Sequence, residues 1–377
     1  MRLLFIIDHL SSGGAQRQLV TLAVKLVEQG HKVQLLYYYD SEFQLERAVS
    51  GGVACRKVAS GSRLQRLFLI RDEIRCMDPE VILAYLTGAS VQAVIARFLS
   101  GVKCPVIVSE RNQIAGTKLR LRLDVASLVY FFADAVVLNA HHVRLEFEKR
   151  YPWLRRSLKT IWNGVDLADF SPSYESNSVG EDQLTLLGIG ALYPVKGQMD
   201  LARALLLLYK KHGVAAKVLW LCRRPLNLSD EEANFKNEVA EFLNQNGIDN
   251  CWEWMEERAD VRPVLASCAA LVHPSSRDGL PNVICEALAC GVAVVAPAAL
   301  ENLRLVQHGV NGFLYEAGSI EDFAKKLVCL SQRSDEEMRK MKESAREFAV
   351  ENLSINKVAE EYSSLFEDSL RCGTKDK

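Results

Sequence analysis

The chain of 377 residues is longer than one hydrophobic core usually supports, so its length favours two domains. With 49% hydrophobic and 25% charged residues, its composition is that of a globular protein and excludes an intrinsically disordered chain. No stretch approaches the roughly 20 uninterrupted apolar residues of a transmembrane helix. The N-terminal apolar run breaks at Asp8 and His9 without a signal-peptide pattern, which favours a cytoplasmic protein.

The formal net charge of −1 hides an uneven distribution. Residues 1–170 hold 23 basic and 16 acidic side chains, or +7, and the remainder holds 23 basic and 31 acidic side chains, or −8. A basic first half is typical of contact with an anionic lipid headgroup, membrane surface or phosphate. No nucleic-acid-binding motif is visible, so nucleic acid is not an expected partner. The ten cysteines show no CxxC spacing, which favours reduced thiols and no zinc site.

Short apolar runs alternate with amphipathic stretches from the first residues onward. RLLFIID (residues 2–8) predicts a buried strand, residues 14–30 predict a helix that ends at Gly30, and HKVQLLYY (residues 31–38) predicts the next strand. Further strands are predicted at Val81–Leu86, Pro105–Glu110 and Asp134–Asn139. This βαβ alternation is typical of a parallel sheet.

The alternation is interrupted by SPSYESNSVGEDQ (residues 171–183), which is polar, Ser-rich and without periodicity, and we place a domain boundary there. It restarts with LTLLGIGAL, AAKVLWLC, AALVHPS and VAVVAP as strands and closes with a long charged helix from about Asp335. We predict an α/β protein with two Rossmann-like, doubly wound parallel-sheet domains that face a cleft. They span residues 1–170 and 184–350, and residues 351–377 form a C-terminal helix for which packing back on the first domain is one option.

The strongest motif is HPSSRDGLPNVICEALACGVAVVAP (residues 273–297). Pro281 at the first helical position and Gly291 just past the end predict a helix of about ten residues between two strands. The N-terminus of such a helix suits a diphosphate. Glu286 lies on it among apolar neighbours and needs hydrogen-bond donors, which ribose hydroxyls would supply. The structural alternative is a surface Asp278 and a Glu286 that pairs with a basic residue.

This segment resembles the E-x7-E motif of retaining GT-B glycosyltransferases of family 4, the "glycosyl transferases group 1" type. The resemblance implies that Asp278 approaches the donor sugar and that Glu286 holds the ribose. It also implies a donor-binding loop and helix start, formed by Gly279, Leu280, Asn282 and Val283, in which the last two donate backbone N–H groups. Asp278 stands where the family usually has Glu, and Pro281 has no N–H to donate.

GIGALYPVKGQ (residues 188–198) resembles the family's strand–GRL–xxx–KG segment. The resemblance implies that Lys196 binds the donor diphosphate as a point charge. Ala191 replaces the usual Arg, and our hypothesis is that Arg223 or Arg224 replaces the lost charge. The structural alternatives are a solvated loop for the two arginines and a surface lysine for Lys196.

Two segments of the first half are weaker candidates for the same site. HLSSGGAQR resembles the family's Gly-Gly loop, in which Gly13 and Gly14 let the backbone approach the donor or acceptor, although such a turn is also explained by tight packing. It is not GxGxxG and therefore does not support a nicotinamide or flavin cofactor. Glu110, at the end of a predicted strand, is a candidate to position acceptor or donor hydroxyls, and a strand-end salt bridge explains it equally well.

Two further segments have structural and functional interpretations. In IWNGVD (residues 161–166), Asn163 is interpreted first as a hinge, because an Asn-Gly turn tolerates positive φ, and second as a ligand-binding residue. KLRLRLDVASLVYFF (residues 118–132) sets Lys118, Arg120 and Arg122 beside apolar residues. It is a candidate membrane-facing or lipid-phosphate element, with a solvated helix face as the alternative.

The resemblance implies anomeric retention, with the leaving diphosphate assisting deprotonation of the attacking hydroxyl. No D-x-D motif is present, so we expect a metal-independent hexosyltransferase without a cofactor. The expected donor is a nucleotide diphosphate sugar, UDP-sugar favoured. The expected acceptor is a lipid-linked oligosaccharide or polysaccharide in surface glycan biosynthesis, reached by peripheral contact with the inner membrane. A sugar-nucleotide 2-epimerase and a non-catalytic sugar-nucleotide-binding protein remain alternatives, the second because of Ala191 and Asp278.

Overall fold

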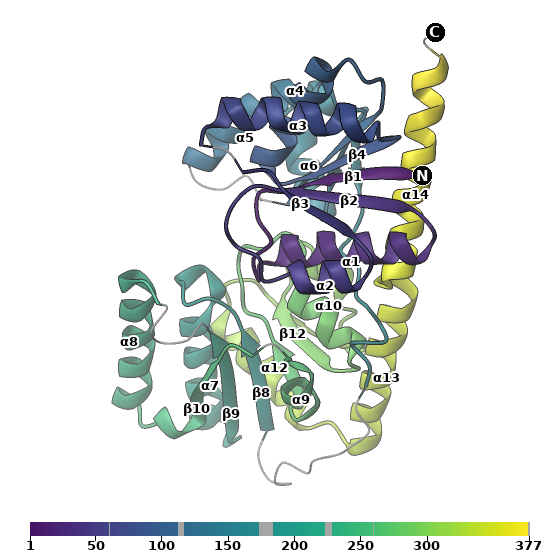
Figure 1. Ribbon diagram of the computed structural model, residues 1–377. Helices are drawn as coiled ribbons and strands as arrows, with labels where there is room; N and C mark the ends of the chain where they lie inside the picture. Colours follow the sequence, from purple (N-terminus) through teal and green to yellow (C-terminus); the bar gives the residue numbers. More distant parts are fainter. Residues whose placement is uncertain (60, 112–116, 173–183, 223–227, 259, 376–377) are drawn as a thin grey trace. The chain divides into compact units, whose positions relative to one another are not determined.

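The computed structural model describes residues 1–59, 61–111, 117–172, 184–222, 228–258 and 260–375 (Figure 1). The chain folds into two compact units. The first contains Met1–Asp166 together with Ser354–Lys377, and the second contains Leu167–Leu353. The last segment of the chain therefore belongs to the first unit. Within the described ranges, no helix combines the length and apolarity that crossing a bilayer requires.

The first unit is built on a seven-stranded parallel sheet in the order β3-β2-β1-β4-β5-β6-β7. The strand order reverses between β1 and β4, the switch point of a doubly wound sheet. Its strands are β1 (Arg2–Ile6), β2 (Lys32–Tyr37), β3 (Ala54–Lys57), β4 (Val81–Tyr85), β5 (Val106–Glu110), β6 (Ala135–Leu138) and β7 (Leu158–Thr160). Its α-helices are α1 (Gly14–Glu28), α2 (Leu45–Ser50), α3 (Arg63–Met77), α4 (Thr87–Ser100), α5 (Thr117–Tyr130), α6 (His141–Arg150) and α14 (Ile355–Lys375).

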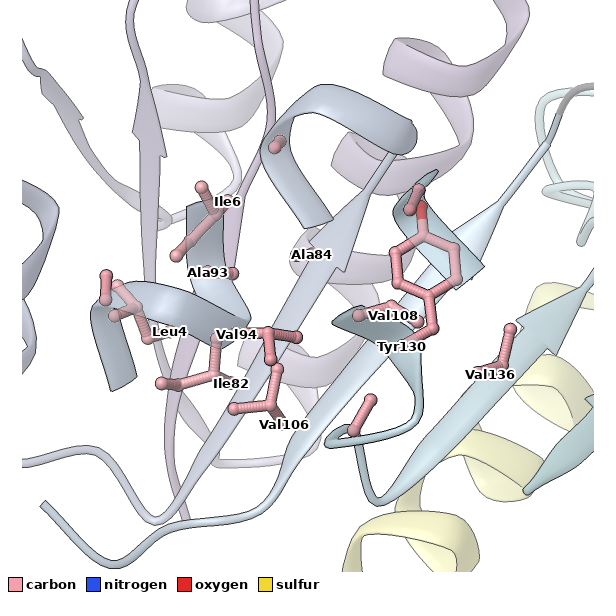
Figure 2. Close-up of a cluster of buried hydrophobic side chains, with 14 of the residues drawn as sticks. Leu4, Ile6, Ile82, Ala84, Ala93, Val94, Val106, Val108, Tyr130 and Val136 are labelled. Atoms are coloured by element: carbon pink, nitrogen blue, oxygen red, sulfur yellow. The ribbon is translucent and has the colours of Figure 1, made fainter. Parts of the chain in front are cut away.

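Two hydrophobic layers hold these helices against the two faces of the sheet. Residues of α3, α4, α5 and α6 cover one face, and residues of α1, α2 and α14 cover the other. Figure 2 shows part of the first layer, where Ile82 and Val106 from neighbouring strands lie near Val94 of α4, and Tyr130 of α5 lies near Val108. Strands buried on both faces read as continuous apolar runs, which is why the sequence predicts them well.

The terminal helix α14 completes the second of these layers. Tyr362 and Phe366 are fully buried in it, and the helix packs beside α1. The long charged helix predicted from Asp335 is in fact two helices, α13 (Asp335–Asn352) and α14, separated at Leu353 and Ser354. The break has a tertiary cause, because the backbone N–H of Ile355 donates to the carbonyl of Val165 at 3.0 Å and no longer to its own helix.

The second unit carries a six-stranded parallel sheet in the order β10-β9-β8-β11-β12-β13. Helices α7, α8 and α12 pack on one hydrophobic layer, and α10 packs against β12 and α13. The strands are β8 (Leu184–Ile189), β9 (Ala216–Cys222), β10 (Trp252–Glu256), β11 (Ala270–Val272), β12 (Ala293–Pro297) and β13 (Gly312–Tyr315). The helices not yet given bounds are α7 (Gln198–His212), α8 (Asp230–Gln245), α9 (Arg262–Ala266), α10 (Asn282–Ala289), α11 (Asn302–Leu305) and α12 (Ile320–Ser331), with short 3-10 turns at Pro152–Leu154, Pro194–Lys196 and Asp249–Cys251.

Candidate active site

The turn that carries Lys196 is joined to the loop after β11. The turn follows β8 and ends at Gly197, which has φ +76° and precedes α7. An ideal Cβ at Gly197 would lie 2.3 Å from the carbonyl oxygen of Pro274, so only glycine fits here without displacement. The backbone N–H of Ser276 also donates to the carbonyl of Val195 at 3.1 Å. These contacts hold the predicted KG and HPSS segments together at the carboxyl ends of the neighbouring strands β8 and β11.

Asp278 is the meeting point of the two segments. Its Oδ1 lies 2.7 Å from Lys196 Nζ, and its Oδ2 lies 3.0 Å from Nε2 of the buried His273. Burial by itself raises the pKa of this carboxyl, but His273 and Lys196 outweigh that effect and hold the pKa of Asp278 well below its usual range. The side chain is therefore a carboxylate at neutral pH, and a weak base.

Helix α10 begins directly after this constellation. It spans Asn282–Ala289, with Pro281 at the N-cap in an extended conformation and no side-chain cap. The predicted position of Pro281 inside the helix was wrong by one residue, because ψ of 106° places Pro281 outside the first turn. The first N–H groups of any helix lack intrahelical acceptors and carry partial positive charge. Asn282 and Val283 stand at this end, as the diphosphate-binding prediction requires, and Gly279 and Leu280 lie in the preceding loop.

Glu286 lies in the second turn of α10 and is 4% exposed. Its charge acts on its helix neighbours: burial raises the pKa of Cys290 to about 11, and the carboxylate of Glu286 adds to the increase. A buried carboxylate in the turn that follows a helix N-terminus is the arrangement that the sequence predicts for ribose binding. Its role there remains a prediction.

Two polar residues near this edge of the sheet received no role from the sequence. His273 follows β11 directly and contacts Asp278, and Glu301 follows β12 and is 1% exposed. Both come within a few residues of the carboxyl end of a parallel strand, where ligands of such sheets bind. That position is the signal that would have identified them.

In the first unit, the Gly-Gly loop leads from β1 into α1. Gly13 is the N-cap of α1, and its N–H donates to Ser11 Oγ at 3.3 Å. Gly14 is the first helical residue. Gly13 has φ of −62°, so this position does not use the left-handed freedom of glycine. A Cβ on Gly13 would lie 2.4 Å from Gln16 Oε1, so the space beside Gly13 is taken by the Gln16 side chain, and the approach of a ligand to this loop stays a prediction.

Glu110 is fully buried at the end of β5. Its Oε2 accepts hydrogen bonds from Thr87 Oγ1 at 2.6 Å and from Tyr130 OH at 3.1 Å, and its Oε1 accepts one from the backbone N–H of Arg111 at 3.1 Å. These contacts join β5 to α4 and α5. The prediction that Glu110 contacts a substrate hydroxyl stays a prediction, and in this conformation the carboxylate is covered by protein.

Arg111, the next residue, connects the sheet edge to the terminal helix. Its guanidinium donates to Ser109 Oγ at 2.9 Å and to Tyr362 OH at 3.0 Å, and also to Tyr85 OH and Asn163 Oδ1. Asn163 is therefore fixed by a charged donor at the edge of the sheet.

Gly164, which follows, does not adopt positive φ, so the conformational reason given for the Asn-Gly turn was wrong. Glycine is required there by close packing, since a Cβ would lie 2.9 Å from Cα of Ile355.

For some of the predicted residues, the structure does not describe the side chain. Arg223 and Arg224 lie outside the described residues, and so does the side chain of Lys118. The structure thus brings together Lys196, Asp278 and the start of α10 in the second unit. It places Gly13, Gly14 and Glu110 at the carboxyl ends of β1 and β5 in the first unit.

Each half of the chain matches the model of a known protein family. Residues 12–169 match the model described as Glycosyltransferase Family 4, and residues 183–333 match the model described as Glycosyl transferases group 1. The chain is a family 4 glycosyltransferase. The crystal structure of Anabaena Alr3699/HepE in complex with UDP aligns with this glycosyltransferase at a TM-score of 0.83 and 20% identity, covering 98% of this chain and 100% of that one. The GT-B fold with two parallel-sheet α/β domains is thereby confirmed.

Curated relatives align over most of their length. The Campylobacter jejuni GalNAc-alpha-(1->4)-GalNAc-alpha-(1->3)-diNAcBac-PP-undecaprenol alpha-1,4-N-acetyl-D-galactosaminyltransferase is 23% identical to this glycosyltransferase, over 97% of this chain and 98% of the relative. The Escherichia coli UDP-Gal:alpha-D-GlcNAc-diphosphoundecaprenol alpha-1,3-galactosyltransferase is 22% identical, over 83% of this chain and 82% of the relative.

Proposed function

We propose that this glycosyltransferase moves a hexose, with anomeric retention, from a nucleotide diphosphate sugar to a hydroxyl of a lipid-linked or polysaccharide acceptor in surface glycan biosynthesis. A UDP-sugar is the favoured donor. The observation that carries the proposal is the Lys196–Asp278–His273 constellation, which directly precedes the N-terminus of α10, where no side-chain cap is present. The relatives named for undecaprenol-diphosphate acceptors support the acceptor class, and the UDP complex of the structural relative supports the donor class.

Charge on the leaving diphosphate would be stabilised from two sides. The α10 N-terminus offers N–H groups and a partial positive charge, and Lys196 offers an ammonium group. Lys196 is held by Asp278 at 2.7 Å, so a bound diphosphate would compete with this carboxylate for the ammonium. This exchange leaves Asp278 oriented by His273 and able to accept hydrogen bonds from hydroxyls of the donor sugar.

Asp278 is poorly suited to act as the general base. Its carboxylate has a pKa held well below the usual range, whereas an efficient base has a pKa close to the working pH. In this proposal the leaving diphosphate instead deprotonates the attacking hydroxyl on the same face of the sugar, which gives retention. Metal independence belongs to the same proposal, because Lys196 and the helix would take the part of a cation.

Ribose binding is assigned to Glu286. An ionised carboxylate only accepts hydrogen bonds, and the two ribose hydroxyls are donors of matching geometry. We expect UDP, GDP or ADP and the corresponding sugars to raise the melting temperature to different extents, with the largest shift for a UDP-sugar. Glu286→Ala should remove most of that shift, while the matched control Glu238→Ala, on the exposed face of α8, should keep it. Equal shifts in both variants would contradict the assignment.

Transfer is tested with a synthetic polyprenyl-diphosphate sugar as acceptor beside a soluble sugar. We expect product from the lipid-linked acceptor with the anomeric configuration of the donor, read by NMR, and no loss of rate in EDTA. Conversion of the donor without acceptor would instead identify an epimerase. Tight donor binding without turnover on any acceptor would identify a binding protein.

A further inference from the structure

Two polar residues without a role in the proposed mechanism, Asp8 and His9, stand at the switch point of the first sheet. Asp8 lies two residues past the end of β1, and the pairing of Ile6 with Ala84 puts it level with Leu86, directly after the neighbouring strand β4. The strand order reverses between β1 and β4. Doubly wound sheets bind their ligands outside the carboxyl ends of the strands at such a point.

Hydrogen bonds from the Gly-Gly loop decide which ring nitrogen of His9 is available. The backbone N–H of Ser11 donates to Nδ1 at 3.4 Å, and Nε2 of Gln16, a side chain only 5% exposed, lies 3.3 Å from the same atom. A backbone N–H can only donate, so Nδ1 carries no proton, and the neutral imidazole holds its proton on Nε2. His9 therefore presents a ring N–H donor on a side chain that is 31% exposed.

Asp8 supplies an acceptor beside this donor. Its backbone carbonyl accepts from the N–H groups of Tyr38 at 3.1 Å and Tyr39 at 2.9 Å, and its Oδ1 accepts from the backbone N–H of His9 at 2.9 Å. Oδ1 lies 3.7 Å from His9 Nε2, which is too far for a direct hydrogen bond. One hydroxyl oxygen at about 2.8 Å from each atom would accept from Nε2 and donate to the carboxylate, because a hydroxyl does both.

The neighbouring strand carries strained backbone at the same level. Leu86 has φ 71° and ψ 149°, a conformation that residues other than glycine rarely adopt. Its N–H donates to the carbonyl of Ser109 at 3.0 Å, and α4 begins at the next residue. Strained residues of this kind collect at ligand-binding sites. The polar pair and the strained residue thus follow the two strands that flank the switch point.

We propose that Asp8 and His9 together bind one hydroxyl of a sugar substrate. A phosphate is a poorer ligand, because the carboxylate of Asp8 repels it. The inference rests on the proposed function, since it adds a substrate contact to the same reaction. The bound hydroxyl is not the attacking one, because it donates its proton to Asp8, whereas the attacking hydroxyl gives its proton to the leaving diphosphate. The pair therefore selects the sugar by a neighbouring hydroxyl.

The test couples substitutions in the pair to the removal of single hydroxyls from the substrates. His9→Asn lacks the Nε2 donor but keeps an oxygen near the position of Nδ1 for the N–H of Ser11, and Asp8→Ala lacks the acceptor. The matched control is Asp134→Asn, at the opposite edge of the sheet, where the carboxylate accepts from the N–H of Val106 at 2.7 Å. The substrates are the polyprenyl-diphosphate sugar and the UDP-sugar on which the wild-type protein acts, each also as its set of single-deoxy derivatives.

For the wild-type protein, we expect removal of the bound hydroxyl to lower kcat/KM by about 10- to 100-fold, as for a hydrogen bond to a charged group. In His9→Asn and Asp8→Ala, the same removal should change kcat/KM by less than about twofold, since the contact is already lost. Asp134→Asn should keep the full wild-type dependence on that hydroxyl. Urea unfolding checks that each variant is folded under the assay conditions.

Calorimetric titration separates the two sources of the hydroxyl. Weaker binding of the UDP-sugar in both variants, with UDP binding unchanged, assigns the hydroxyl to the transferred sugar. Unchanged binding of both, with coupling to one acceptor derivative, assigns it to the acceptor sugar. Variants that keep the wild-type kcat/KM, or lose it by the same factor for every derivative, overturn the proposal. Failure of the proposed function appears separately, as a wild-type protein that forms no product from the complete substrates.

Discussion

Gly197→Ala would place a methyl group where the Lys196 turn meets the loop after β11. Gly197 has φ +76°, and its Cβ would lie 2.3 Å from the carbonyl oxygen of Pro274 and 2.8 Å from the Cβ of Pro274. Left-handed backbone costs an alanine about 1 to 2 kcal/mol, and overpacking against neighbouring atoms adds about 1 to 3 kcal/mol. We therefore expect the free energy of unfolding to fall by about 2 to 5 kcal/mol.

Gly213 provides the matched control. It ends α7 with φ +65°, and a Cβ there would meet no atom within 4 Å. Gly213→Ala therefore carries the conformational cost alone, about 1 to 2 kcal/mol. Urea unfolding followed by tryptophan fluorescence measures both variants, and calorimetric titration with UDP measures donor binding. Only Gly197→Ala should weaken UDP binding, because it moves the turn that carries Lys196 away from the proposed diphosphate site.

Equal losses of stability in the two variants would refute the reasoning, since the contact with Pro274 would then have no energetic weight. Unchanged UDP affinity in a destabilised Gly197→Ala protein would refute its second part. In that case the junction of the two segments would serve folding and not the site.

Three further predictions concern single side chains. Arg346 donates to the carbonyls of Phe170 and Ala289, so Arg346→Met should lower the free energy of unfolding by about 2 kcal/mol, whereas Arg339→Met, on an exposed helix face, should change urea unfolding little. Asp278 has a lowered pKa in the folded state, so its stabilising effect is present above about pH 4 and lost as the pH falls through the folded pKa. Asp278→Asn should therefore reduce the melting temperature at pH 7 more than at pH 3, and an equal reduction at both would contradict this. Glu110→Gln puts an NH2 group toward hydroxyl donors and should cost about 1 to 3 kcal/mol in urea unfolding, whatever its effect on transfer.

The strands were predictable because both sheets are parallel and buried. RLLFIID gives β1 at Arg2–Ile6, and VAVVAP gives β12 at Ala293–Pro297, each as an apolar run between turns. The break between α13 and α14 was not predictable in this way. No Gly or Pro lies between Asp335 and Cys372, and the break depends on a hydrogen bond to Val165, far away in the sequence.

The candidate site, too, could be predicted only in part from the sequence. The resemblance to family 4 glycosyltransferases implied one site for Lys196, Asp278 and Glu286, and the structure brings Lys196 and Asp278 into contact. The contact of His273 with Asp278 depends on how the loop after β11 folds back, which residue types do not reveal. Glu110 and Gly164 were predicted from local properties, but their surroundings are set by Tyr130 and Ile355, which come from other parts of the fold.

The membership of α14 in the first unit has a consequence for biosynthesis. Tyr362 and Phe366 leave the ribosome after the whole of the second unit, yet they belong to the core beneath α1. The amino-terminal unit therefore stays incomplete during translation, while Leu167–Leu353 has already been made in full. Vectorial synthesis usually lets the earlier unit mature first, and here the order of completion is inverted.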